Sequence, residues 1–151
     1  MLMSFPVFSF TAKLTLLWIT GALIFGGIPA SLNFRKYHEL AAQGVSSKGM
    51  VIALEPSNHQ FVGYSYEANG RIFTAKGSAG YGNPSFGLLR VGDVVSVSYL
   101  PGNADVSCLG NPHELLNNEE ISILGSAVLF PTVALAVWSA RYPSFRRWLT
   151  R

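Results

Sequence analysis

Cysteine, histidine and charged residues are all scarce in this chain. It has a single cysteine, Cys108, so an internal disulfide is excluded and the fold must be held together by packing. The three histidines are scattered singly, which does not fit the closely spaced ligands of a metal site. No phosphate-binding loop, nucleophile elbow or carboxylate pair stands out. We therefore expect a protein that is not an enzyme, with no catalytic residue, no metal and no cofactor.

Acidic residues are missing from both ends of the chain. All eight lie between residues 39 and 120, whereas the charged side chains of residues 1–34 and 121–151 are Lys and Arg only. The net charge of +3 therefore describes basic ends rather than a continuous basic surface. We expect no binding to nucleic acid; a basic tail that binds nucleic acid is the weaker alternative.

Charge is absent from two long apolar stretches, residues 14–34 and 121–140. Each is long enough to cross a bilayer as a helix, which takes about 20 residues. The sequence predicts a membrane α+β protein in which two transmembrane helices enclose a small antiparallel β domain, barrel- or sandwich-like, at residues 35–120. Residues 1–13 form an N-terminal segment, and residues 141–151 form a basic, aromatic tail.

The cations beside the two stretches predict the orientation, because short flanks rich in Lys and Arg are retained in the cytoplasm. Four arginines follow the second stretch and outweigh Arg35 and Lys36 after the first. We expect a multi-pass protein of the bacterial inner (plasma) membrane with both termini cytoplasmic and residues 35–120 extracytoplasmic. The first stretch could instead be a signal cleaved near residues 28–30, which would leave the domain on the same side.

Small and aromatic residues give the membrane segments two further roles. Small residues spaced by four predict close helix packing, within one chain or between chains. These residues are Ala22, Gly26 and Ala30 in the first stretch and Ser122 and Ser126 in the second. Basic and aromatic residues of the tail predict anchors in the headgroup layer over anionic lipid. They include Arg141, Tyr142, Arg146, Arg147 and Trp148.

Between the spans the pattern changes from helical to β-type. Residues 35–43 are good helix formers that stop at Gly44, and strands are expected at residues 50–54, 61–67, 94–99 and 106–109. Asn69-Gly70 predicts a two-residue hairpin turn. The resulting register pairs Ala68 with Arg71, Ser65 with Thr74, Tyr66 with Phe73, and Tyr64 with Ala75.

Two proline signals mark the second helix. Asn111-Pro112-His113-Glu114 predicts a helix start with a capping box, so this helix should begin before the apolar stretch. Pro131 lies in the middle of that stretch and predicts a kink, because it removes one backbone hydrogen bond.

Turn and strand motifs carry a resemblance to a known family. Tyr64-Ser65-Tyr66 stands before Asn69-Gly70-Arg71, and the run Gly-Asp-Val-Val-Ser-Val-Ser-Tyr-Leu-Pro-Gly-Asn occupies residues 92–103. With the order span, β domain, span, the chain resembles the DUF3592 group of bacterial membrane proteins over residues 46–109. That pattern often has Pro where this chain has Ala104. The resemblance implies a membrane-anchored β domain and supplies no catalytic residue.

The favoured function is a non-catalytic interaction or accessory protein, which includes an immunity or assembly factor. Its partners would be the lipid bilayer and another protein or a second copy of the chain. Residues 77–84 read as a long exposed loop, so binding is expected around Tyr81, Phe86 and Arg90.

Two other functions compete with this one. The first is a thiol-dependent enzyme or redox sensor using Cys108; this cysteine lies in a short strand with no cation beside it in the sequence, so we expect a partly buried and unreactive thiol instead. The second is a small transporter or channel subunit. The spans carry no ionisable residue, which disfavours that alternative.

Overall fold

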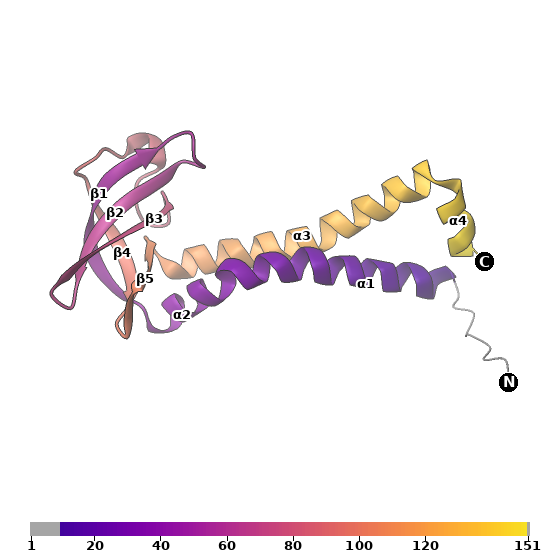
Figure 1. The fold of residues 1–151 in the computed structure, drawn as a ribbon, viewed down its shortest axis with the longest axis horizontal. Helices are drawn as coiled ribbons and strands as arrows, with labels where there is room; N and C mark the ends of the chain where they lie inside the picture. Colours follow the sequence, from indigo (N-terminus) through magenta and orange to yellow (C-terminus); the bar gives the residue numbers. More distant parts are fainter. Residues whose placement is uncertain (1–9, 151) are drawn as a thin grey trace. The chain divides into compact units, whose positions relative to one another are not determined.

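The structure is a computed structural model that describes residues 10–150 (Figure 1). The chain divides into two compact units. One is the β domain, residues 33–120, and the other is the helical unit, whose described residues are 10–32 and 121–150. The predicted arrangement of an antiparallel β domain between two long apolar helices is confirmed.

Five antiparallel strands form the β domain and curve into a nearly closed barrel (Figure 1). The strands are β1 (Val45–Glu55), β2 (Phe61–Ala68), β3 (Arg71–Ser78), β4 (Val94–Leu100) and β5 (Asn103–Leu109). Their order in the sheet is β3-β2-β1-β4-β5. A Cβ placed on Gly77 of β3 would lie 3.1 Å from the Cβ of Leu109 of β5, so the two outer strands meet. Contact between the outer strands brings the open sheet close to a closed barrel.

The hairpin between β2 and β3 has the register predicted from its turn. Tyr66 pairs with Phe73, and Ala68 pairs with Arg71 next to the turn. Asn69 and Gly70 have φ values of 53° and 72°, the left-handed conformation that a two-residue turn requires. The predicted hairpin is therefore confirmed.

Two strands are longer than their apolar patterns indicate. β1 begins at Val45 rather than residue 50, because its polar start pairs with β4, from Val45–Tyr99 to Met50–Val94. β5 begins at Asn103 rather than residue 106. Ile52 is an extra residue in β1, since Val51 pairs with Tyr64 and the next paired residue, Ala53, lies opposite Gly63. Such a bulge bends the strand and re-aims the side chain of the extra residue.

The barrel interior is apolar and aromatic. Tyr66 lies at its centre, with ring centroids 5.8 Å from Phe73 and 5.7 Å from Tyr99. Its hydroxyl donates a hydrogen bond to the carbonyl of Ala104, so a buried phenol has a partner. The stacked pair of Tyr66 and Phe73 lies across β2 and β3, and aromatic cross-strand pairs of this kind stabilise a sheet.

Helices precede and follow the barrel in the chain. The first helical run is α1 (Phe10–Pro29), a π-helical segment at Ala30–Phe34 and α2 (Arg35–Gln43), which ends where predicted. The remaining helices are α3 (Pro112–Arg141) and α4 (Pro143–Thr150). Phe10–Ile28 and Pro112–Arg141 are both long and apolar enough to cross a membrane. α3 begins at the predicted start, where the Asn111 side chain accepts the His113 N–H at 3.0 Å.

Within the helical unit, α1 runs beside the second part of α3 (Figure 1). A Cβ placed on Gly26 would lie 2.9 Å from that of Ala127, so the two backbones approach closely here. The Ser126 hydroxyl donates to the carbonyl of Phe25 at 3.0 Å. Gly21 makes a second close approach, to Pro131, the proline inside α3.

Candidate functional site

Two aromatic side chains of the loop between β3 and β4, Tyr81 and Phe86, are packed against other parts of the β domain. Both side chains are half-buried. Tyr81 packs against Leu40 of α2 together with Cys108 and Leu115, and Phe86 packs against the barrel core. The two side chains are therefore less exposed than predicted, and their role in binding stays a prediction.

Hydrogen bonds hold this loop against the barrel. The Asn83 side chain accepts the Ser96 N–H at 2.7 Å and donates to the Ser96 carbonyl at 2.9 Å. A neighbouring strand would make the same pair of hydrogen bonds with Ser96. The carbonyl of Tyr81 accepts the Asn111 N–H at 2.7 Å. The contacts come from residues distant in the sequence, so the glycine-rich composition of the loop does not reveal them.

Arg90 is exposed, and the turn that follows it borders a cluster of exposed apolar side chains. We call Met50, Ile52, Val91 and Val94 the apolar patch; they are 50%, 46%, 64% and 66% exposed. Exposed apolar side chains that gather in one place are typical of interaction surfaces, whereas scattered ones are not.

The backbone brings the members of the apolar patch together. Met50 and Val94 are direct partners across β1 and β4. The turn containing Val91 lies against β1, because the Gly92 N–H donates to the Val51 carbonyl at 2.8 Å and the Val51 N–H donates to the Asp93 carbonyl at 2.9 Å. Ile52, the bulge residue, follows Val51 directly.

Sequence reasoning misses the apolar patch, although one signal is present. The alternation of residues 94–99 directs Val95, Val97 and Tyr99 to one face and leaves Val94 on the other, whereas Met50 belongs to a fully apolar run with no such alternation. Only the bulge at Ile52 and the long-range pairing of β1 with β4 place the patch side chains on the outer wall.

Cys108 is buried under α2 rather than inside the barrel, and its predicted burial is confirmed. Burial raises the pKa of its thiol from 9.0 to about 11, although the ammonium group of Lys36 acts in the opposite direction. Lys36 is distant from Cys108 in the sequence, so the expectation that no cation lies beside this thiol in the sequence does not reveal this interaction. Because burial outweighs that cation, the reactive thiolate is disfavoured at neutral pH.

A hollow of about 360 Å³ lies beside this cluster, between α2, the β3–β4 loop and the start of α3. Ser46, Ser98, Asn111 and His113 are among its lining residues, and the Ser98 hydroxyl donates to the Gly110 carbonyl at 3.0 Å. Within residues 10–150 no three His, Cys, Asp or Glu side chains gather as a metal site would require. The hollow therefore offers hydroxyl and amide groups rather than a charged centre.

The predicted packing and anchor residues all fall in the helical unit. Gly26 is buried and Ser126 half-buried at the α1–α3 contact, Ala22 and Ala30 are half-buried, and Ser122 is exposed. Arg141, Tyr142, Arg147 and Trp148 are exposed. The side chain of Arg146 lies outside the part of the chain that the structure describes.

No family model, curated protein or solved structure matches the chain. The resemblance to the DUF3592 group therefore stays a prediction.

Proposed function

We propose that the chain is a non-catalytic interaction protein of the bacterial inner membrane, which displays its β domain outside the cytoplasm for binding to another protein. The apolar patch is the observation that carries this proposal. Its side chains are between 46% and 66% exposed, and folding the barrel alone does not cover them. A second protein surface would remove them from water, at about 25 cal/mol for each Å² of apolar area buried.

Charge around the patch fits a protein partner. The exposed Arg90 directly precedes Val91, and the exposed Lys48 lies two residues before Met50. Arg is enriched at the centres of protein interfaces. Of the residues expected to bind, Arg90 keeps this role in the proposal, whereas Tyr81 and Phe86 serve to fix the loop that carries it.

The membrane location rests on the two long apolar helices. Leu23 and Leu124 are 70% and 67% exposed within the helical unit, which suits lipid and not water as their surroundings. The arginines after α3 favour a cytoplasmic C-terminus by the positive-inside rule. With two spans the N-terminus would then also be cytoplasmic, and the β domain extracytoplasmic.

Site-specific photo-cross-linking in cells tests the proposed interaction. A benzophenone amino acid replaces Met50 or Val94 in the full-length chain, and Thr74, which is exposed on β3, provides the control position. We expect a discrete protein adduct of the same mass from Met50 and Val94 and none from Thr74. A mass equal to two copies would identify the partner as a second copy of the chain.

A charge placed in the apolar patch provides a second test of the interaction. Val94→Lys should abolish the adduct formed from Met50, because the ammonium group would have to be desolvated at the interface. Thr74→Lys is the matched control and should leave the adduct intact. The proposal is wrong if the three positions cross-link equally, or if neither patch position forms a protein adduct.

A further inference from the structure

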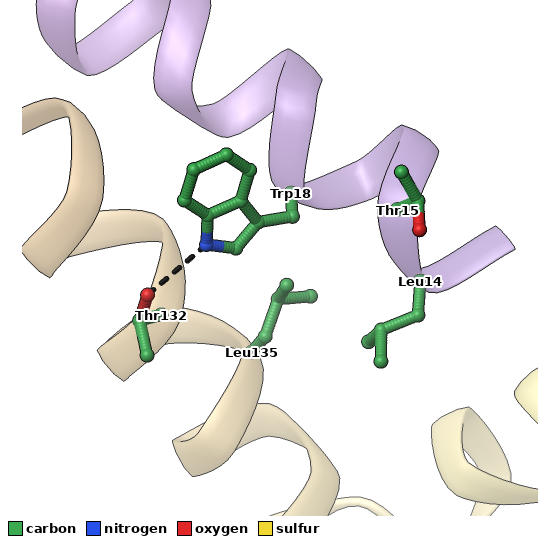
Figure 2. Close-up of a pocket in the computed structure, with 5 residues that line it drawn as sticks. All are labelled: Leu14, Thr15, Trp18, Thr132 and Leu135. Carbon is green, nitrogen blue, oxygen red and sulfur yellow. Dashed lines mark hydrogen bonds between the residues drawn. The ribbon is translucent and has the colours of Figure 1, made fainter. Parts of the chain in front are cut away.

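The helical unit contains an apolar groove between α1 and α3. It has a volume of about 360 Å³ and is lined by Leu14, Thr15, Trp18, Thr132 and Leu135. Figure 2 shows the indole of Trp18 directed toward Thr132, with Leu14 and Leu135 bordering the same space. The Trp18 Nε1–H donates to the Thr132 hydroxyl at 3.0 Å, so the polar atom of this indole has a partner and its carbon face remains for an apolar ligand.

A second apolar cleft, of about 150 Å³, shares Leu135 with this groove. Residues of three helices line it, among them Gly21 of α1, Pro131 and Trp138 of α3, and Phe145 of α4. The two hollows therefore lie on either side of a common residue, Leu135. An elongated apolar group fits such a pair of hollows better than a compact one does.

Cations lie at one end of the helical unit, the end that we propose to face the cytoplasm. The Lys13 ammonium group donates to the Trp148 carbonyl at 3.0 Å and lies 5.2 Å from the centroid of the Trp148 ring. An ammonium group has three N–H donors, so this contact leaves donors for an anion. Lys13 directly precedes the groove residue Leu14, and Arg147 directly precedes Trp148.

The side-chain charge at this end has one sign. Residues 1–34 and 121–151 contain five Lys or Arg residues and no Asp or Glu, so no side-chain carboxylate of the helical unit offsets this positive charge. An apolar groove whose residue Leu14 directly follows the cation Lys13 matches an anionic phospholipid, in which an acyl chain and a phosphate are joined. Basic pockets between membrane helices bind anionic headgroups in this way.

We propose that the helical unit binds one anionic phospholipid, with an acyl chain in the groove between α1 and α3 and its phosphate at Lys13, close to Arg147. The site differs from a general attraction to the membrane surface because it requires the groove as well as the charge. The inference rests on the membrane location in the proposed function and is independent of the protein partner.

Native mass spectrometry of the purified full-length chain tests the site. The chain is held in mild detergent with equal amounts of phosphatidylglycerol and phosphatidylcholine that carry identical acyl chains. We expect one bound phosphatidylglycerol to predominate. Lys13→Gln should reduce that adduct about fivefold, the effect of one cation at a membrane surface, whereas Lys48→Gln in the β domain should not change it.

A bulky side chain placed in the groove distinguishes lipid binding at a defined site from a general attraction to surface charge. Thr15 lines the groove, whereas Thr20, also exposed on α1, does not. Thr15→Trp should remove the phosphatidylglycerol adduct and Thr20→Trp should retain it. Equal helix content by circular dichroism and equal elution of both variants would show that each is folded.

Equal retention of the two lipids, or equal loss in the two tryptophan variants, would overturn the inference. So would a groove occupied by a second copy, seen as a dimer that carries no lipid. Failure of the lipid site can be distinguished from failure of the proposed function. Cross-linking from Met50 and Val94 in cells tests the protein partner, and extraction with alkaline carbonate tests membrane integration.

Discussion

The hydroxyl oxygens of Tyr64 and Ser107 lie 3.0 Å apart inside the barrel, where both side chains are buried. Tyr64 belongs to β2 and Ser107 to β5, strands that are separated by β1 and β4 in the sheet. The hydrogen bond therefore crosses the barrel interior and ties distant strands together. It also gives two buried polar groups a partner, in place of the water that they lose on folding.

The two hydroxyls should be energetically coupled, because each single substitution removes the same hydrogen bond. Tyr64→Phe removes one hydrogen-bond partner of the buried Ser107 hydroxyl, so we expect a loss of about 1–3 kcal/mol in the free energy of unfolding. Ser107→Ala should cost a similar amount, and the double variant should cost less than the sum. Denaturant unfolding of all four proteins measures this coupling. Strictly additive losses would show that the two hydroxyls do not interact.

The hairpin turn allows a comparison between two glycines. Gly70 has a φ of 72°, whereas the φ of Gly102 is not left-handed and a Cβ added there would meet no atom within 4 Å. Gly70→Ala should lower the free energy of unfolding by about 1 kcal/mol, because alanine is strained in this conformation. Gly102→Ala should be neutral or slightly stabilising. Equal effects in thermal unfolding would contradict the turn geometry.

Sequence alone could predict the features that depend on neighbouring residues. Asn69-Gly70 determines the β2–β3 register through its own backbone preferences, and Pro112 marks the start of α3 for the same reason. Ile52 and Tyr81 could not be placed in this way. The exposure of Ile52 depends on how β1 pairs with β2, and the burial of Tyr81 depends on α2, about 40 residues earlier in the chain.

The reactivity of Cys108 should depend on pH in a defined direction. Its pKa is about 11 in the folded chain, against an ordinary value of 9.0, so the folded protein holds roughly a hundredfold less thiolate at pH 8. Labelling with a charged maleimide should be slow in the folded state and fast after denaturation. Rapid labelling of the folded chain, with loss of cellular function in Cys108→Ala, would instead favour thiol chemistry.

The same shift in pKa predicts how stability changes in alkali. Both states keep the proton below about pH 9, so the thiol does not affect stability there. As pH rises from about 9 to 11, the unfolded state loses its proton first, and the free energy of unfolding should fall. Cys108→Ala should remove this part of the pH dependence, and an unchanged profile would contradict the raised pKa.

Adjacent glycines in α1 test the contact between the long helices. Gly26 faces Ala127, whereas a side chain at Gly27 would meet no atom within 4 Å. In a Cys108→Ala background, Gly26→Cys with Ala127→Cys should form a disulfide on mild oxidation, because a small separation of the helices brings the Cβ atoms from 2.9 Å to the range of about 3.5–4.5 Å that a disulfide requires. Gly27→Cys with Ala127→Cys is the matched control and should not. Cross-linking of both pairs at equal rates would contradict this packing.

Accessibility of single cysteines in spheroplasts tests most directly the central claim, that the barrel is displayed outside the cytoplasm between two membrane spans. In the Cys108→Ala background, Gly102→Cys reports on the exposed β4–β5 turn, and Ser144→Cys reports on the exposed start of α4. We predict that a membrane-impermeant maleimide labels Gly102→Cys in intact spheroplasts, and Ser144→Cys only after the membrane is permeabilised. The reverse labelling pattern, or equal labelling at both positions before permeabilisation, would contradict this topology.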